Sequence, residues 1–252
     1  MLAQFTQWMP DSLSTLAFWS LVFVSYLTSA ITAALGIGGG VTLLAIMANL
    51  LPTSAVIPLH GVIQFGSNVG RLSILFRFVD WRLVLWFSIG SLIGSVVGAG
   101  ASTQMPAAGL QIAMGAFILY TAWFPPIKLP SGKKFLSLLG VVTSFISMIV
   151  GGIAPLVFAA IKPMFAERTA LVGTMAALIS GQQLLKVLFF GFFGFVFTDW
   201  YLMIALMLIT GYLGTLTGRL FLERFTAEQV QPVLKVVLTV MAARLLYLGL
   251  FG

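Results

Sequence analysis

Long apolar runs, separated by short polar breaks, cover most of the chain. The runs extend over residues 13–35, 41–51, 53–76, 82–103, 106–123, 134–151, 155–165, 169–194, 199–222 and 228–250. A helix needs about 20 residues to cross the hydrocarbon core of a bilayer, and most of these runs are long enough. The pattern therefore predicts an all-α polytopic membrane protein.

Two of the runs are too short to cross a bilayer. Residues 41–51 and 155–165 would rise only about 16 Å as helices, at about 1.5 Å per residue. Each run follows a glycine cluster, Gly36-Ile37-Gly38-Gly39-Gly40 in the first case and Gly151-Gly152 in the second. We predict that each short run is a half-helix that forms a broken or re-entrant pair with the run before it.

The composition supports a membrane environment and excludes several classes of protein. Of 252 residues, 60% are hydrophobic and 8% are charged, and the mean hydropathy is +1.10. Soluble domains are about 25% charged, so this chain cannot cover a globular surface with polar groups. A cytosolic enzyme, a nucleic-acid-binding protein and a secreted disulfide scaffold are therefore excluded. The chain has no cysteine and one histidine, so we expect no metal site and no cofactor.

The basic residues predict the topology. No Lys or Arg precedes Arg71, so the start lacks the basic region of a signal peptide and the first run is expected to be retained. Basic residues gather near the ends of the runs, at Arg77 and Arg82; Lys128, Lys133 and Lys134; Lys162 and Arg168; and Arg219 and Arg224. If both broken pairs enter and leave on one side, six full crossings bring every cluster to the cytoplasmic side. We expect a multi-pass protein of the bacterial inner membrane with cytoplasmic basic loops.

The two halves of the chain resemble each other. A shift of 115 residues places Gly66 on Gly181, Ser67 on Gln182, Asn68 on Gln183 and Arg71 on Lys186. Asp80-Trp81-Arg82 corresponds to Asp199-Trp200-Tyr201, and Gly94 and Gly98 correspond to Gly214 and Gly218. We predict a first transmembrane repeat over residues 1–123, a cytoplasmic linker over 124–133 and a second repeat over 134–252.

The predicted crossings give the two repeats opposite orientations. Each inverted repeat would contain a broken Gly-rich helix pair and three long transmembrane helices. Interrupted helices in corresponding positions of two such repeats are typical of secondary transporters whose site lies near the bilayer midplane. A duplicated membrane scaffold without a transport role is the alternative.

These motifs resemble a known family. Gly36-Ile37-Gly38-Gly39-Gly40 with its short apolar run, the helix with Ala55, Val79-Asp80-Trp81-Arg82-Leu83 and the later Gly-rich helix are similar to the sulfite exporter TauE/SafE family, also called the 4-toluene sulfonate uptake permease family. The second half departs from the family pattern, because Gly151-Gly152-Ile153-Ala154-Pro155 stands where the family tends to repeat a GxGGG-like turn. The resemblance covers almost the whole chain. It implies an inner-membrane permease for sulfur-containing anions that has no nucleotide-hydrolysing subunit.

The glycine breaks are the first candidate for anion binding. A half-helix that starts near Val41 would present free backbone N–H groups and the positive end of its dipole, a geometry that receives anions. Close helix crossing is the alternative role of these glycines. The candidate residues are Gly38, Gly39, Gly40, Gly151 and Gly152.

Two polar stripes are the second candidate. The first comprises Gln64, Ser67, Asn68 and Arg71, and the second comprises Gln182, Gln183 and Lys186. Their spacings place each stripe on one helical face, and charged residues inside membrane helices usually face a cavity. We expect Arg71 and Lys186 to stand at opposite mouths of a central anion site that Ser67, Asn68, Gln182 and Gln183 complete. Interhelical hydrogen bonding is the alternative for the amides, and is favoured for Gln64. Snorkelling to the headgroups is the alternative for the cations.

Three other features carry weaker signals. His60 lies on the helix of the first stripe and is a candidate for proton coupling, with an interhelical hydrogen bond as the alternative. Asp80 and Asp199, each followed by Trp, indicate interface anchors whose carboxylates cap the next helix. Gly90, Gly94 and Gly98, four residues apart, predict a close helix approach, either within one chain or between protomers of a homo-oligomer.

The sequence therefore favours a secondary permease that moves a small sulfur-containing anion, such as sulfite or an organosulfonate, by alternating access. An anion channel and a non-transporting assembly or receptor subunit are the alternatives. An intramembrane enzyme would need a nucleophile and a base, and the chain has no Gly-x-Ser-x-Gly motif. We expect the small anion and the lipid bilayer as partners, and no nucleic acid.

Overall fold

The computed structural model describes residues 10, 13–35, 38–125, 135–220 and 227–252. All regular structure in these segments is helical, which confirms the predicted all-α membrane fold. The ten α-helices are α2 (Thr15–Leu35), α3 (Gly39–Leu50), α4 (Thr53–Leu75), α5 (Trp81–Gln104), α6 (Ala107–Trp123), α7 (Leu136–Val150), α8 (Ala154–Ile161), α9 (Arg168–Phe192), α10 (Tyr201–Leu220) and α11 (Ala227–Phe251). Three short 3₁₀ turns are η1 (Phe76–Phe78), η3 (Lys162–Met164) and η4 (Phe197–Trp200). Most of the predicted linker 124–133, with Lys128 and Lys133, lies outside the described residues, as do Gly36, Ile37, Lys134 and Arg224.

Five helical segments of the described chain are long and apolar enough to cross a membrane. They are Thr15–Ala34, Trp81–Gln104, Arg168–Phe192, Phe197–Gly218 and Gln229–Phe251, and they support a multi-pass membrane protein. Two of the six predicted crossings are missing from this set. The α4 helix has 23 residues but carries the first polar stripe, and the α6 helix has only 17 residues.

Both glycine breaks adopt a backbone conformation that strongly favours glycine. Gly38 has φ 104° and Gly151 has φ 89°, values that side chains with a Cβ rarely adopt. Each break is followed by a short helix, α3 with 12 residues and α8 with 8. Pro155 lies in the first turn of α8, where its missing N–H costs no helical hydrogen bond. The prediction of two short helices after the glycine clusters is confirmed.

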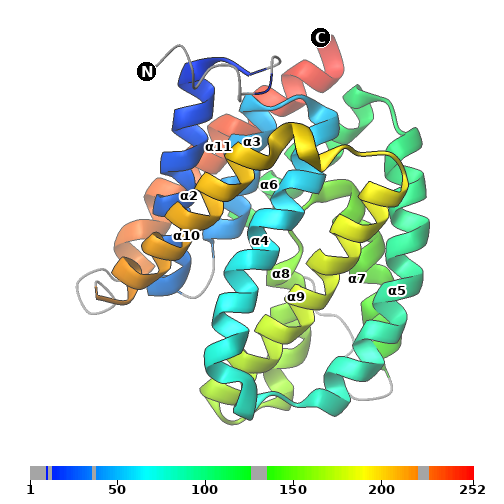
Figure 1. The fold of residues 1–252 in the computed structure, drawn as a ribbon, viewed down its shortest axis with the longest axis vertical. Coiled ribbons are helices and arrows are strands. Elements are labelled where there is room, and N and C mark those ends of the chain that lie inside the picture. Colours follow the sequence, from blue (N-terminus) through cyan, green and yellow to red (C-terminus); the bar gives the residue numbers. More distant parts are fainter. Residues whose placement is uncertain (1–9, 11–12, 36–37, 126–134, 221–226) are drawn as a thin grey trace.

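The two halves of the chain exchange helix contacts. The α5 helix of the first half packs against α7 of the second, and α10 of the second half packs against α2 of the first (Figure 1). The α4 and α9 helices lie side by side and run in opposite directions, and α6 packs against α11. The pairing is thus reciprocal between the halves. The exact repeat boundaries and the inversion stay predictions.

Glycines on α5 and α10 allow the helices of the two halves to pack closely against each other. A Cβ at Gly94 would collide with the carbonyl of Val141 on α7, and a Cβ at Gly214 would collide with the carbonyl of Tyr26 on α2. Gly90, Gly98 and Gly218 make equivalent approaches to the same two helices. The sequence left open whether these glycines serve contacts within or between chains. In the structure they pack within one chain.

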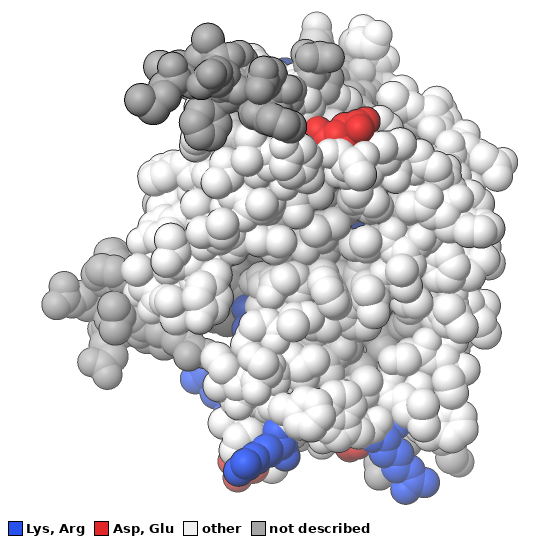
Figure 2. Space-filling model, in the orientation of Figure 1, with Lys and Arg blue, Asp and Glu red and all other residues white. Residues whose placement is uncertain are grey.

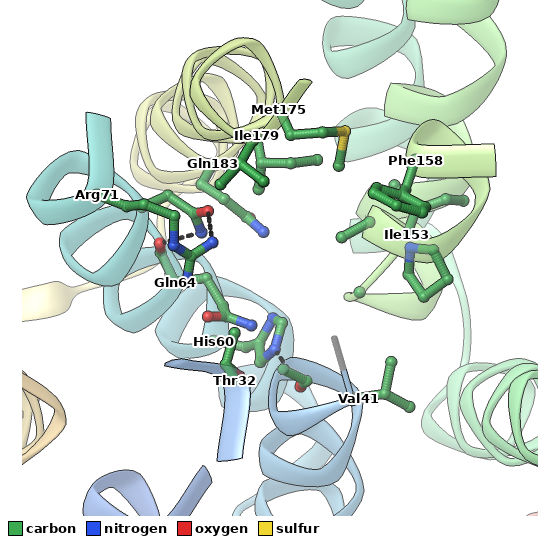
Figure 3. Close-up of a pocket in the computed structure, with 17 residues that line it drawn as sticks. Thr32, Val41, His60, Gln64, Arg71, Ile153, Phe158, Met175, Ile179 and Gln183 are labelled. Carbon is green, nitrogen blue, oxygen red and sulfur yellow. Dashed lines mark hydrogen bonds between the residues drawn. The ribbon is translucent and has the colours of Figure 1, made fainter. Parts of the chain in front are cut away.

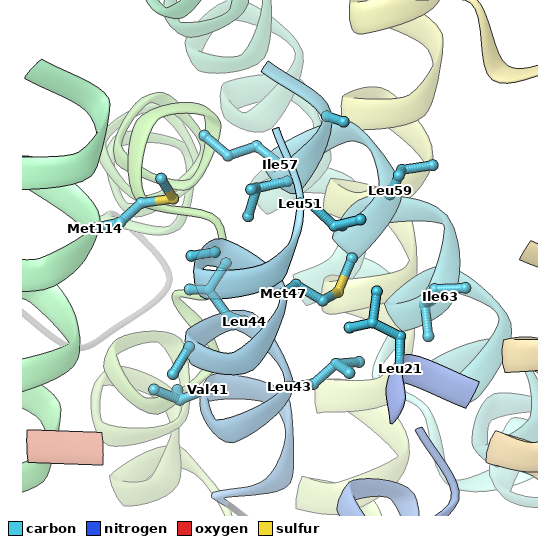
Figure 4. Packing of buried hydrophobic residues seen from close by; sticks show 14 of the residues in the cluster. Leu21, Val41, Leu43, Leu44, Met47, Leu51, Ile57, Leu59, Ile63 and Met114 are labelled. Carbon is cyan, nitrogen blue, oxygen red and sulfur yellow. The ribbon is translucent and has the colours of Figure 1, made fainter. Parts of the chain in front are cut away.

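The half-helix α3 lies inside an apolar core. Leu44 and Met47 of α3 are fully buried, and they pack with Leu21 of α2, Leu59 of α4 and Met114 of α6 (Figure 4). At its far end, Arg244 of α11 donates a 2.8 Å hydrogen bond to the carbonyl oxygen of Asn49. Because α3 is enclosed on several sides, its glycine-rich start is held in a fixed position.

Charged groups gather at the ends of the helix bundle. Lys and Arg atoms are prominent at the lower end of the molecule in Figure 2, where α4 ends and α9 begins in Figure 1. At this end the Asp80 carboxylate accepts a 3.0 Å hydrogen bond from the N–H of Leu83, so the predicted cap of α5 is confirmed. Asp199 lies instead in η4, where its carboxylate accepts a 3.4 Å hydrogen bond from the hydroxyl of Thr198.

Candidate functional site

A cavity of about 100 Å³ lies where both glycine breaks meet the central helices α4 and α9 (Figure 3). Its wall comes from the two glycine breaks with their half-helices α3 and α8, from α4 and α9, and from one residue of α2. The lining residues are Thr32, Gly38, Gly40, Val41, His60, Gln64, Asn68, Arg71, Gly152, Ile153, Ala154, Pro155, Phe158, Val172, Met175, Ile179 and Gln183. We call this space the central cavity.

The first turns of both half-helices line the central cavity. The α3 helix begins at Gly39 after Gly38, and neither this helix nor α8 has a side-chain cap at its start. The first backbone N–H groups of a helix have no partner within that helix, and the helix dipole adds a partial positive charge there. The cavity wall therefore carries two weakly positive helix ends, although Pro155 removes one N–H donor from α8.

The α4 wall supplies polar groups and one cation. Asn68 donates a 2.8 Å hydrogen bond from its Nδ2 to the carbonyl oxygen of Gln64, so its Oδ1 faces Arg71. Arg71 donates from Nη1 to this Oδ1 at 3.4 Å (Figure 3). The Gln64 amide packs directly on Gly40, where an added Cβ would displace it. These contacts hold the guanidinium at the edge of the cavity.

His60 connects α4 to the first break. Its ring is fully buried, and Nε2 lies 3.0 Å from the carbonyl oxygen of Gly40. A carbonyl oxygen only accepts hydrogen bonds, so Nε2 carries the hydrogen. The second ring nitrogen, Nδ1, is buried and has no hydrogen-bond partner in the part of the chain that the structure describes. The interhelical hydrogen bond that the sequence offered as an alternative is therefore present.

The opposite wall is mostly apolar. Phe158 of α8 and Met175 and Ile179 of α9 face the space across from Arg71 (Figure 3). Gln183 is the polar residue of this wall, and its buried Oε1 has no partner among the described residues. The cavity thus has a polar, cationic side and an apolar side.

Several predicted site residues lie elsewhere. Ser67 lines a second, smaller cavity of about 60 Å³ beside α10, which it shares with Arg71. Gln182 donates from Nε2 to the hydroxyls of Thr143 at 2.9 Å and Ser144 at 2.8 Å, both on α7. The expectation that Ser67 and Gln182 complete the central site is not met. Gln182 takes the alternative role of joining two helices.

Lys186 also differs from its predicted position. Its side chain is fully buried and donates a 2.6 Å hydrogen bond from Nζ to the carbonyl oxygen of Gly151. It passes over Gly61, where an added Cβ would lie 2.9 Å from the Lys186 Cδ. The residue therefore stands behind the cavity wall and not at an open mouth. Gly39, another predicted site residue, packs against the backbone of Thr28 on α2 and does not line the central cavity.

Sequence reasoning missed most of the apolar wall. Phe158, Ile179 and Val172 resemble any other apolar residue of a membrane helix, so no local signal marks them. One signal was available for Met175, because the repeat shift places it opposite His60 in the alignment of the halves. Both residues line the central cavity.

A larger cavity of about 510 Å³ lies at the other end of α4 and α9. We call it the end cavity. Its wall includes Thr53 and Ser54 at the start of α4, Phe190 near the end of α9, and Asp199 of η4. Along α9, one turn separates Gln183 of the central cavity from Lys186, and another separates Lys186 from Phe190 of the end cavity. Lys186 therefore lies between the two spaces.

The family comparison agrees with this architecture. The family model described as sulfite exporter TauE/SafE matches residues 21–245, which include every residue that lines the central cavity. The chain belongs to the sulfite exporter TauE/SafE family. This is a family of membrane transporters of the anion-exporter type, which agrees with the apolar helices of the chain. No curated protein and no solved structure matches the chain. In this TauE/SafE chain, both half-helix starts and the central helices fall inside the matched region.

Proposed function

We propose that the chain is a secondary permease that moves a small sulfur-containing anion, sulfite or an organosulfonate, across the bacterial inner membrane. The observation that carries this proposal is the meeting of two half-helix starts and the Arg71 guanidinium at one cavity. No Asp or Glu is among the described residues that line it. Backbone N–H groups at helix starts and a guanidinium favour anions, and a carboxylate would oppose them.

The two-sided wall supports an anion with an organic part. Arg71 and Asn68 offer hydrogen-bond donors on one side, and Gln183 adds an amide on the other. Phe158, Met175 and Ile179 provide apolar contacts that would suit the carbon chain of a sulfonate. Gly38, Gly40 and Gly152 allow an oxyanion to approach the backbone closely.

The arrangement of cavities supports alternating access. His60 lines the central cavity and Ile57 lines the end cavity, one turn away on α4. Leu59, Lys186 and the neighbouring core residues are fully buried between them. Movement of the helices on either side of this closed layer would expose the central cavity first to one side of the membrane and then to the other. The basic residues at the lower end of the bundle favour a cytoplasmic position for that end.

Flux measurements with purified protein in proteoliposomes test the proposal. We would compare sulfite, methanesulfonate, sulfoacetate, taurine, sulfate and acetate. We expect saturable uptake of sulfite or a sulfonate that the other sulfur anions inhibit. Absence of saturable flux for all of them would contradict the permease, and flux that is linear in concentration without counterflow would favour a channel.

A pair of arginine variants supplies the matched control. Arg71→Gln removes the cation of the central cavity and should raise KM about tenfold or more, because a charge-assisted hydrogen bond contributes about 1.5–3 kcal/mol. Arg77→Gln removes an exposed cation of η1 and should leave KM unchanged. Equal effects of both changes would mean that Arg71 acts only through the general field of the protein.

A further inference from the structure

We propose that Lys186 carries a proton together with the anion, so that transport is a symport of one proton with one monovalent anion. This inference rests on the proposed permease function and adds its coupling ion. It starts from the position of the Lys186 amine. This amine is fully buried, donates a hydrogen bond to Gly151 in the glycine break before α8, and lies between two cavities.

Lys186 has no carboxylate partner in the described part of the chain. Its one hydrogen-bond acceptor is the neutral carbonyl oxygen of Gly151. The carboxylates with described surroundings, Asp80, Glu167 and Asp199, all stand at helix ends. Isolated charges inside a protein cost several kcal/mol each, and the cost falls when an opposite charge approaches. A charge on Lys186 and an anion in the central cavity therefore stabilise each other.

Only a thin wall separates Lys186 from an anion in the central cavity. Lys186 donates to the carbonyl oxygen of Gly151, and the next residue, Gly152, lines the cavity. Lys186 also passes over Gly61, and the residue before it, His60, lines the cavity. Because binding free energies are reciprocal, an anion that favours a proton on Lys186 is itself bound more tightly once that proton is present. The two ions then enter and leave the site together.

The neighbouring titratable groups leave Lys186 as the best-placed proton carrier. On α4 they are His60, close to Lys186, and Arg71, at the other edge of the cavity. On the other elements packed against α9, they are Arg77 of η1 and Arg82 at the start of α5, both at the lower end of α4; α8 has none. Arginine keeps its proton, so His60 and Lys186 are the exchangeable groups. His60 lines the central cavity but not the end cavity, and its Nε2 hydrogen is used on Gly40, whereas Lys186 lies between the two cavities.

Lys186 is also placed to exchange protons with either side. Gln183 and Phe190, one turn before and after it on α9, line the central and end cavities. The neutral amine accepts a proton from water as the anion binds, which forms one N–H bond and gives an ammonium. When the site opens to the other side, the anion leaves and that N–H bond breaks to return the proton to water. The hydrogen bond to Gly151 persists in both protonation states, because amine and ammonium both donate.

Accumulation of methanesulfonate in proteoliposomes tests the inference. The sulfonate stays ionised through the neutral range, so any proton movement belongs to the protein. With the membrane potential clamped at zero and the inside one pH unit more alkaline, one-to-one symport predicts about tenfold accumulation, because one pH unit corresponds to about 1.4 kcal/mol. Saturable exchange without accumulation in the wild type would overturn the inference and leave the permease standing. Absence of saturable flux would overturn both.

Lysine variants and one control variant complete the test. Lys186→Met has a similar length and no proton site, and Lys186→Arg keeps its charge permanently. We expect accumulation to fall from about tenfold to onefold in both, and to remain near tenfold in Arg77→Gln, which changes an exposed cation of η1. Lys186→Gln provides a second neutral variant if the methionine protein does not fold. Tenfold accumulation by any folded neutral variant would overturn the inference, as would an equal loss of accumulation in Arg77→Gln.

Discussion

The Nε2 atom of His60 lies 3.0 Å from the carbonyl oxygen of Gly40, so a side chain of α4 holds the first turn of the half-helix α3. The second break has an equivalent contact, because Lys186 of α9 donates to the carbonyl oxygen of Gly151 at 2.6 Å. Each central helix therefore holds one glycine break. Movement of α4 relative to α9 would pull directly on the walls of the central cavity.

Loss of the His60 contact should destabilise the protein. In His60→Leu the partly buried Gly40 carbonyl loses this donor, and we expect a loss of about 1–3 kcal/mol in the free energy of unfolding. Thermal unfolding in detergent would show this as a lower Tm. His60→Gln retains an N–H donor and should recover part of the loss. Equal Tm values for wild type and His60→Leu would mean that the contact contributes nothing to stability.

The positive φ at Gly151 leads to a second prediction. Gly151→Ala should destabilise the protein by about 1–3 kcal/mol, because the backbone is strained for any residue with a Cβ. The added Cβ would also press on Leu44 of α3. Gly70→Ala on α4 is the matched control, since a Cβ there meets nothing within 4 Å. We expect its Tm to equal or exceed that of the wild type, and a similar loss in both variants would contradict the strain argument.

Much of this architecture follows from the sequence because membrane helices leave a strong signal. The ten apolar runs correspond to the ten described helices, since an unbroken backbone in lipid must satisfy its hydrogen bonds within each segment. The glycine breaks were visible because the positive φ at Gly38 and Gly151 strongly favours glycine. Helix pairing was not visible, because α5 packs against α7, far from it in sequence.

The candidate site was predicted less completely, for a physical reason. A polar residue inside a membrane helix can face a cavity or a neighbouring helix, and sequence spacing does not distinguish the two. Gln183 lines the central cavity, whereas the adjacent Gln182 bonds to α7. Lys186 is near the cavity but behind its wall. Only the rotation of α9 about its axis decides these roles.

These neighbouring glutamines provide a matched pair for a third prediction. Gln183→Leu should raise KM for the transported anion about tenfold or more, through loss of a hydrogen bond to a charged group, with little change in Tm. Gln182→Leu should lower Tm with little change in KM, because it leaves the hydroxyls of Thr143 and Ser144 without their amide donor. Initial rates of uptake and thermal unfolding separate the two effects. The reverse pattern would place the anion on the other face of α9.

Single-cysteine labelling gives the most direct test that the anion passes through the central cavity. The chain has no cysteine, so Met175→Cys on the apolar wall introduces the only reactive thiol, and Ile209→Cys on an exposed face of α10 is the control. Counterflow of methanesulfonate would be measured in proteoliposomes before and after complete modification with a bulky methanethiosulfonate reagent. We predict that modification stops counterflow in Met175→Cys but not in Ile209→Cys, and that methanesulfonate slows the modification of Met175→Cys. Full counterflow after complete modification of Met175→Cys would contradict the assignment of the central cavity as the anion site.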